Sequence, residues 1–225
     1  MAVNISAYQS IHTKLSAQQV ALIAVSKTKP NEELMELYAL GQRAFGENYV
    51  QELVDKAGSL PKDIEWHFIG HLQSNKVKYI APFVHLIHGV DSEKLLQEIN
   101  KQAVKQQRVI DCLLQVHIAE EETKFGFDEA SLITFLQSGR LADYPNVRIK
   151  GLMGMASFSD DHVQVQKEFK QLKKCFDLTQ DSMGTACSIL SMGMSGDYEL
   201  AIQEGSNMVR IGSLLFGARN YPSAK

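Results

Sequence analysis

Short apolar runs alternate along this chain with longer segments in which apolar residues recur at helical spacing. The apolar runs are rich in β-branched residues and are bounded by polar residues, Gly or Pro, a pattern typical of buried parallel strands. These runs lie at 20–26, 43–46, 65–69, 85–89, 109–117, 147–153, 188–191 and 208–211. Eight buried strands in one chain indicate a single large sheet.

Each predicted strand is followed by a predicted helix. The helices are expected at about 31–41, 49–57, from 74, from 91 or 92 to 107, 128–137, 161–180, 196–204 and from 213, with a leading helix at 1–17. Such a chain forms either an eight-fold barrel or a doubly wound sheet. The number of units, and the lack of a glycine-rich dinucleotide motif after the first strand, favour an α/β fold: a (β/α)8 TIM barrel with an extra N-terminal helix.

Composition narrows the class of protein. With 225 residues, 44% hydrophobic, and no low-complexity linker, residues 1–225 are expected to form a single domain. A net charge of −3 argues against nucleic-acid or anionic-membrane partners. No secretory leader or membrane-length apolar stretch is evident. The three cysteines lack a CxxC spacing, so free thiols and a cytoplasmic location are expected.

Lys27 is the first candidate for chemistry, because it directly follows the first strand. An amine at the carboxyl end of a buried strand can bond covalently to a carbonyl compound. A lysine at a strand end is more often a solvated surface residue, so the position of Lys27 alone does not identify a covalent site. Lys29 is a rival amine, although Pro30 indicates that the strand ends before Lys29. The positive charge of Lys29 would also lower the pKa of Lys27.

The loops after the seventh and eighth strands resemble a phosphate cradle. They contain Ser191, Gly193, Met194 and Ser195 in one loop, and Gly212 with Ser213 in the other. Glycines let the backbone approach an anion, and a helix N-terminus is expected after each loop, although a plain turn is the ordinary interpretation. Closing the barrel pairs the eighth strand with the first and brings Lys27 to this cradle. An amine beside a phosphate site predicts a phosphorylated aldehyde, of which pyridoxal 5′-phosphate (PLP) is the best known.

Two further residues have both a functional and a structural interpretation. Arg210 lies in an apolar strand and needs a partner, either an aromatic nitrogen of the ligand or an ion pair with Glu47 or Glu204. A permanently protonated guanidinium would leave a pyridine nitrogen unprotonated and make PLP a weak electron sink. Asn48 would hydrogen-bond the pyridine hydroxyl or cap the following helix, and capping is the usual role.

Three residues near strand ends are weaker candidates. His67 alternates with Ile69 along its strand and is expected to be a hydrogen-bonded core histidine rather than a base. His71 lies past the end of that strand and is the better site candidate of the two. Lys124 is expected at the rim of the pocket. No histidine spacing or carboxylate cluster in the sequence indicates a metal site, so none is expected.

Five ordered motifs make the chain similar to the PLP homeostasis (PLP-binding) protein family, which itself resembles the N-terminal barrel of bacterial alanine racemase. They are AVSKTKP at 24–30, FGENYVQE at 45–52, WHFIGHLQSNK at 66–76, SMGMS at 191–195 and MVRIG at 208–212. The resemblance implies that Lys27 carries PLP as an internal aldimine. It also implies that Ser191, Gly193, Met194, Ser195, Gly212 and Ser213 hold the phosphate, and that Arg210 faces the pyridine nitrogen. The loop with Lys124 matches less closely.

The resemblance also bears on activity. Family members are regarded as PLP carriers or buffers that affect amino-acid and keto-acid pools, so a non-catalytic protein in transient contact with PLP-dependent apoenzymes is expected. Alanine racemases have a further β-domain after the barrel, which supplies the usual dimer contact, and a second acid/base from the partner subunit. This chain ends directly after the eighth unit, so the resemblance implies that it lacks this dimer contact and is a monomer. Two alternatives stay open: a weak PLP-dependent amino-acid racemase with Lys27 as one base, and a Schiff-base aldolase for a sugar phosphate, which leaves Arg210 unexplained.

Overall fold

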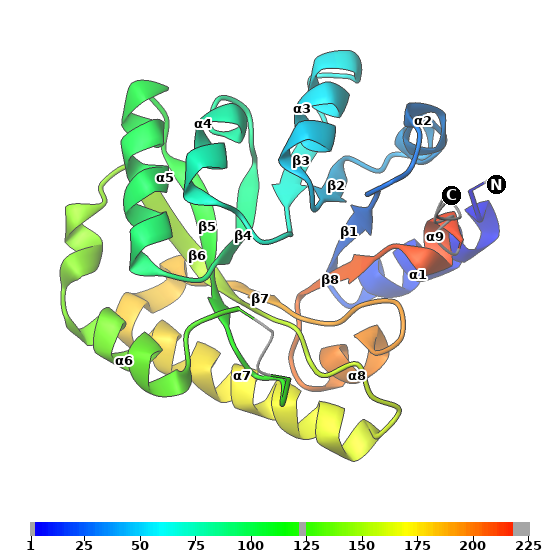
Figure 1. Cartoon of the computed structure of the whole chain (residues 1–225). Helices are drawn as coiled ribbons and strands as arrows, with labels where there is room; N and C mark the ends of the chain where they lie inside the picture. Colours follow the sequence, from blue (N-terminus) through cyan, green and yellow to red (C-terminus); the bar gives the residue numbers. More distant parts are fainter. Residues whose placement is uncertain (1–2, 122–124, 218–225) are drawn as a thin grey trace, which may run out of the picture.

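The computed structural model describes residues 3–121 and 125–217, and its eight strands close into a parallel barrel in the order β1 to β8 (Figure 1). This arrangement confirms the predicted (β/α)8 barrel. The strands are β1 (Ala21–Val25), β2 (Ala44–Glu47), β3 (Glu65–Phe68), β4 (Leu86–Val90), β5 (Ile110–Val116), β6 (Val147–Gly154), β7 (Ile189–Ser191) and β8 (Met208–Ile211). Because all neighbours are parallel, their carboxyl ends lie at one end of the barrel.

The barrel closes where β8 pairs with β1, in the register Ala24 opposite Ile211. The ends of these two strands are therefore level with each other. A side chain on Gly212 would place its Cβ 3.2 Å from the Val25 carbonyl oxygen, which shows how closely the two strand ends approach. The first and last strands thus meet although they are far apart in the sequence.

The helices surround this barrel. They are α1 (Ile5–Ala17), α2 (Asn31–Ala39), α3 (Val50–Ser59), α4 (Val77–Ile80), α5 (Glu93–Lys105), α6 (Glu129–Gln137), α7 (His162–Met183), α8 (Tyr198–Gln203) and α9 (Ser213–Phe216), with 3-10 turns at Ser74–Lys76, Arg140–Asp143 and Gly184–Ala186. The leading helix α1 begins at Ile5, because Asn4 caps it by accepting a hydrogen bond from the Ala7 N–H. It lies beside α9, and the Asn4 N–H donates to the Leu215 carbonyl at 2.8 Å (Figure 1).

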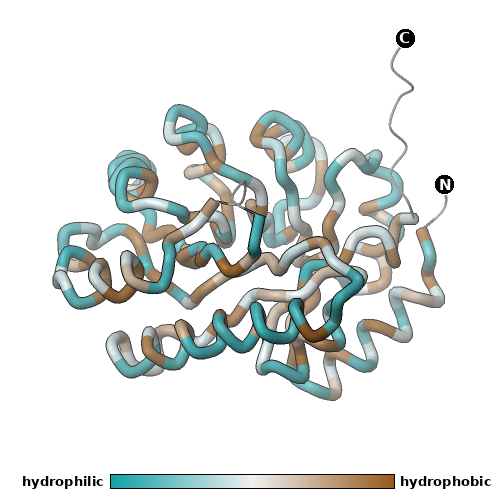
Figure 2. The backbone as a smooth tube through the Cα atoms, turned by 60° about the horizontal axis from the view of Figure 1, so that its bottom comes forward, coloured by the Kyte–Doolittle hydropathy of each residue, from teal (hydrophilic) through white to brown (hydrophobic). Residues whose placement is uncertain are grey.

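Apolar side chains fill both the inside of the barrel and the layer between barrel and helices. Ile23, Leu86, Leu113, Met153 and Met208 form the inner cluster. A larger cluster, which includes Trp66 and Phe68 of β3, packs under the helices. Figure 2 shows hydrophilic turns alternating with hydrophobic ones along the outer helices, as expected of helices with one buried face. No helix within residues 3–121 and 125–217 has the length and apolarity needed to cross a membrane.

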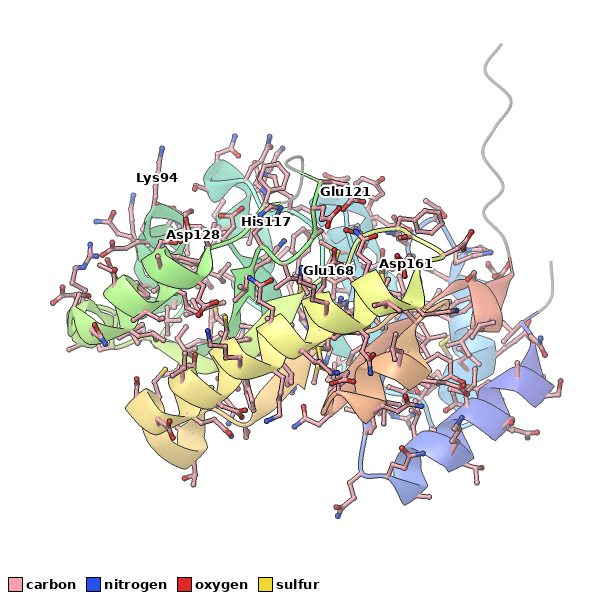
Figure 3. All side chains as sticks on the ribbon, turned by 90° about the horizontal axis from the view of Figure 1, so that it is seen from below. Lys94, His117, Glu121, Asp128, Asp161 and Glu168 are labelled. Carbon is pink, nitrogen blue, oxygen red and sulfur yellow. The ribbon has the colours of Figure 1, made fainter. Side chains whose placement is uncertain are left out.

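Polar side chains secure the loops after β5 and β6. Glu168 of α7 accepts from both the backbone N–H and the hydroxyl of Ser157 at 2.6 Å, and that hydroxyl in turn accepts from the Glu120 N–H at 3.1 Å. Figure 3 labels Glu168 on α7, with Asp161 and Asp128 at the starts of α7 and α6. Both aspartates cap their helices, as expected of Asp at an N-cap.

Candidate functional site

Lys27 lies directly after β1, in a tight turn. The Lys29 N–H donates to the Ser26 carbonyl at 3.0 Å, and Thr28 adopts a positive φ of 63°. The Glu52 carboxylate of α3 holds this turn by accepting from the Thr28 N–H at 2.6 Å. The half-buried Lys27 is therefore fixed at the carboxyl end of β1, next to β8.

Lys29, the rival amine, is held in a different contact. Its Nζ donates to the carbonyl of Phe216, the last residue of α9, at 2.6 Å and lies 3.8 Å from the Glu33 carboxylate. The side chains of Lys29 and Glu33 are each only 10% exposed. Lys29 thus anchors α9 to the start of α2.

A buried ion-pair network on α3 and β2 contacts the turn that contains Lys27. Lys56 of α3 donates to Glu47 at 2.7 Å, to Glu52 at 2.7 Å and to the Ser26 carbonyl at 2.8 Å. Glu47 also accepts from the Ser26 hydroxyl at 2.6 Å. Burial raises the pKa of Glu47, while Lys56 acts in the opposite direction. The network joins the ends of β1 and β2 to α3.

Two hydrogen bonds join the loops after β7 and β8. The Arg210 N–H donates to the Gly193 carbonyl at 3.0 Å, and the Gly212 N–H donates to the Ser195 hydroxyl at 3.2 Å. Ser213 follows at once as the first residue of α9. Four of the six residues predicted to hold a phosphate, Gly193, Ser195, Gly212 and Ser213, are therefore brought together from two strand ends.

The start of α8 differs from the prediction. The helix begins at Tyr198 instead of Gly196, because residues 195–197 form a turn. Within this turn the Asp197 carboxylate accepts from the Met194 N–H at 2.5 Å. The Met194 N–H, a donor of the expected phosphate cradle, is thus already hydrogen-bonded to a carboxylate oxygen.

Arg210 has partners other than the carboxylates considered from the sequence. Its guanidinium donates to the Ser191 hydroxyl at 2.6 Å and to the Gly154 carbonyl at 3.0 Å. The predicted ion-pair alternative is wrong: Glu47 bonds to Lys56, and Glu204 accepts from Gln166. Burial lowers the pKa of Arg210 to about 10, so the group is protonated at neutral pH.

A line of buried hydrogen bonds leads from Arg210 through Ser191 to two histidines. His88 Nδ1 lies 3.3 Å from the Ser191 hydroxyl, and His88 Nε2 lies 2.9 Å from His67 Nδ1. Burial lowers the pKa of His67 to about 3 and that of His88 well below its usual value, so both rings are neutral at neutral pH. His67 is the hydrogen-bonded core histidine that the sequence predicted. Sequence reasoning missed His88. Because His88 lies two residues after the barrel-facing Leu86 on the same strand, its side chain is expected to face the barrel interior as well.

Asn48 does not cap α3. Tyr49 is the N-cap residue of that helix and provides no side-chain hydrogen bond. The Asn48 side-chain oxygen is buried and finds no hydrogen-bond partner in the described part of the chain. Gly70 packs against the same residue so closely that an added Cβ would lie 2.4 Å from the Asn48 carbonyl oxygen. A fixed, unpaired acceptor of this kind is suited to a donor from a ligand.

The two remaining weaker candidates, His71 and Lys124, differ in outcome. His71 Nδ1 lies 3.1 Å from the Asp91 carboxylate, and its ring stacks on Phe125 with 4.0 Å between ring centroids. It therefore lies at the carboxyl ends of β3 and β4, as a rim residue would. Lys124 lies outside the described residues.

Gly193 gives a direct test of the loop geometry. We expect Gly193→Ala to lower the free energy of unfolding by about 2–4 kcal/mol, because φ is +94° and the new Cβ would lie 2.6 Å from the Ala201 Cβ. Gly139→Ala is the matched control, with φ of +72° and open space around it, and should cost about 1–2 kcal/mol. Urea denaturation measures both variants, and an equal loss would show that the contact with α8 is unimportant.

Comparison with known proteins finds similar chains over most of this sequence. The alanine racemase N-terminal domain family matches residues 4–220. The pyridoxal phosphate homeostasis protein of Aquifex aeolicus is 43% identical over 201 residues, which are 89% of this chain and 87% of that protein.

Solved structures give the same result at the level of the fold. PipY of Synechococcus elongatus PCC7942 without PLP superposes with a TM-score of 0.87 at 37% identity, covering 94% of this chain and 99% of that one. The same protein with PLP bound superposes with a TM-score of 0.84 at 35% identity, over the same shares of the two chains. The likeness therefore spans almost the whole barrel of both proteins.

Proposed function

The chain belongs to the pyridoxal phosphate homeostasis protein family, within the group defined by the alanine racemase N-terminal domain, and from this premise we propose that it is a PLP-binding protein of vitamin B6 homeostasis. It would hold PLP on Lys27 and buffer or deliver it, with effects on amino-acid and keto-acid metabolism. Residues 1–225 would act as one PLP-binding barrel domain. The observation that supports the proposal is that β1, which ends just before Lys27, pairs with β8, whose following loop is hydrogen-bonded to the loop after β7.

The amine and the phosphate loops match two ends of the same ligand. Lys27 would bond to the aldehyde carbon, with loss of water. Ser191, Gly193, Met194, Ser195, Gly212 and Ser213 would surround the phosphate. The Met194 N–H would exchange its bond to the Asp197 carboxylate for one to a phosphate oxygen, since both acceptors are anionic.

The unpaired oxygen of Asn48 would accept a hydrogen bond from the pyridine hydroxyl. A buried acceptor without a partner costs free energy, so a ligand that supplies the donor is bound more tightly. The buried, unpaired oxygen of Asn48 thus supports PLP binding independently of the phosphate loops.

Arg210 favours a carrier over a catalyst. Its guanidinium is protonated at neutral pH and acts only as a donor, so the pyridine nitrogen facing it would be an unprotonated acceptor. An unprotonated ring withdraws electrons weakly, which slows removal of an α-proton from an amino acid. The sugar-phosphate aldolase interpretation gives Arg210 no comparable partner.

A transfer assay tests the carrier role. The PLP-loaded protein, freed of unbound PLP, is mixed with the apo form of a PLP-dependent aminotransferase, and the regain of aminotransferase activity is followed. We expect full transfer from the loaded protein and none from protein reduced with borohydride, in which the bond to Lys27 is fixed. Failure of the untreated protein to transfer would rule out delivery.

The match to the alanine racemase domain keeps a weak racemase as the second candidate, with Lys27 as one base. Prolonged incubation of the PLP-loaded protein with L-alanine, followed by chiral chromatography, tests it. We expect no more D-alanine than with Lys27→Ala, and a clear excess would make the protein an enzyme.

The proposal also covers the cellular location, the protein partners and the oligomeric state. We infer a cytoplasmic location, since Cys112, Cys175 and Cys187 are all buried free thiols. We infer transient contact with PLP-dependent apoenzymes and a monomeric state. Light scattering that gave twice the mass of one chain would overturn the last of these.

A further inference from the structure

Three potential metal ligands gather at the opposite end of the barrel from Lys27. Glu65 is the first residue of β3, and His85 directly precedes β4. His67 follows Glu65 by two residues, so both side chains lie on the same face of β3. One carboxylate oxygen and one nitrogen from each ring lie within 4.8 Å of one another.

The inner residue of this cluster has an unpaired nitrogen. The His67 side chain is 3% exposed, and its Nδ1 is already hydrogen-bonded to His88 Nε2 at 2.9 Å. Its Nε2 is buried and has no hydrogen-bond partner within the described residues. The His85 ring lies next to it, with 5.2 Å between the ring centroids. A buried nitrogen left without a donor or acceptor calls for a ligand that is not a protein group.

We propose that Glu65, His67 and His85 form a zinc site at the amino-terminal end of the barrel, with water as the fourth ligand. Two imidazoles and one carboxylate are a ligand set that Zn²⁺ takes in proteins. Bond lengths of about 2.0–2.2 Å place tetrahedral ligand atoms about 3.3–3.6 Å apart, so the ligand atoms need to approach one another by at most about 1.5 Å. Glu65 and His85 are exposed, which gives them freedom to rotate and gives the ion a path from solvent.

The histidine behind the site orients the buried ligand. With a metal on Nε2, His67 carries its proton on Nδ1 and donates to His88 Nε2, and His88 then donates from Nδ1 toward the Ser191 hydroxyl. A ligand histidine whose other nitrogen donates a hydrogen bond is the usual arrangement around protein-bound zinc. The cluster therefore has both the ligands and the support that such a site needs.

The three thiols of the chain compete poorly for the metal. Burial raises the pKa of both Cys175 and Cys187 to about 11 and that of Cys112 further, so these thiols are protonated at neutral pH. The sequence did not indicate the site, because its ligands come from two strands and form no local motif. Only the register that places β3 beside β4 brings them together.

Calorimetric titration with ZnCl₂ tests the site. We expect one Zn²⁺ per chain in the wild type and at least a tenfold loss of affinity in both His85→Ala and Glu65→Gln. Both residues are exposed, so the variants should fold as the wild type does. His162→Ala is the matched control, since it removes an exposed histidine at the start of α7, and it should leave binding unchanged. All proteins are brought to equal PLP content, so binding of Zn²⁺ by PLP itself is common to them.

Co²⁺ gives a second readout of geometry. The wild type should show the strong visible bands of four-coordinate Co²⁺, and His85→Ala should lose them. The proposal is overturned if the wild type binds no Zn²⁺ at micromolar concentration. It is equally overturned if His85→Ala and Glu65→Gln bind Zn²⁺ as tightly as His162→Ala.

Discussion

Lys27→Ala is expected to abolish the visible absorption that PLP acquires when it bonds to the protein. The variant keeps the loops after β7 and β8, so it should still bind PLP through the phosphate, without a covalent bond. We expect the affinity to fall at least a hundredfold, or about 3 kcal/mol. Absorption spectra recorded during titration with PLP measure both the covalent band and the affinity.

Lys29→Ala is the control for this experiment, because it removes the amine two residues away. Lys29 bonds to the Phe216 carbonyl at the end of α9, so its loss should cost about 1 kcal/mol of stability and leave the absorption band in place. If Lys29→Ala removed the band and Lys27→Ala kept it, the assignment of the amine would be reversed.

Lys56→Met is expected to produce the largest loss of stability. The substitution keeps much of the volume of the side chain and removes the charge that contacts Glu47, Glu52 and the Ser26 carbonyl. The Lys56 side chain is 6% exposed, and that of Glu47 is fully buried. Removing one partner of a buried ion pair costs about 3–5 kcal/mol, because the other charge stays buried. Urea denaturation at neutral pH measures this loss.

The same variant should respond to pH in a defined direction. Burial raises the pKa of Glu47 above its ordinary value, and Lys56 opposes that shift, so its removal raises the pKa further. A carboxyl whose pKa is higher in the folded state favours folding at low pH and loses that contribution as pH rises through the folded pKa. The destabilisation by Lys56→Met should therefore be smaller at pH 5 than at pH 8.

Lys101→Met serves as the control for Lys56→Met. Lys101 is 62% exposed and lies 3.5 Å from Glu98 within α5, an arrangement that contributes little. Its substitution should change the free energy of unfolding by less than about 0.5 kcal/mol at both pH values. An equal loss in the two variants would show that the buried network does not stabilise the end of β1.

The strands and the meeting of β1 with β8 could be predicted from the sequence, because buried parallel strands have a strong local signal. The apolar run before Lys27 and the run around Arg210 each identify a strand by composition alone. Barrel closure then follows from the number of units, and it places Lys27, at the end of β1, next to β8.

Partners that depend on side-chain geometry could not be predicted. Lys56 lies on a helix, where a lysine is usually solvated, and only the packing of α3 brings it to Glu47. Asn48 precedes a helix, where capping is the usual role of an Asn, but its buried side-chain oxygen has no partner within the described residues. The partners of Arg210 are a hydroxyl and a carbonyl, which no pattern of charges in the sequence indicates.

Helix starts show the same limit. Gly196 was expected to begin α8, but the Asp197 carboxylate accepts from the Met194 N–H and holds residues 195–197 in a turn. A side-chain to backbone bond of this kind competes with helix formation over a few residues. Such competition depends on the exact path of the loop and leaves no periodic signal.

Borohydride reduction of the PLP-loaded protein, followed by proteolysis and mass spectrometry, tests the central claim most directly. Reduction fixes the bond between the amine and PLP, so the modified lysine can be read from the peptide masses. We expect the added mass on the peptide that contains Lys27, at close to one PLP per chain, and on no other lysine to a comparable extent. Protein that carries no reduced adduct, or carries it on Lys29 or elsewhere, would contradict the assignment of Lys27 as the residue that holds PLP.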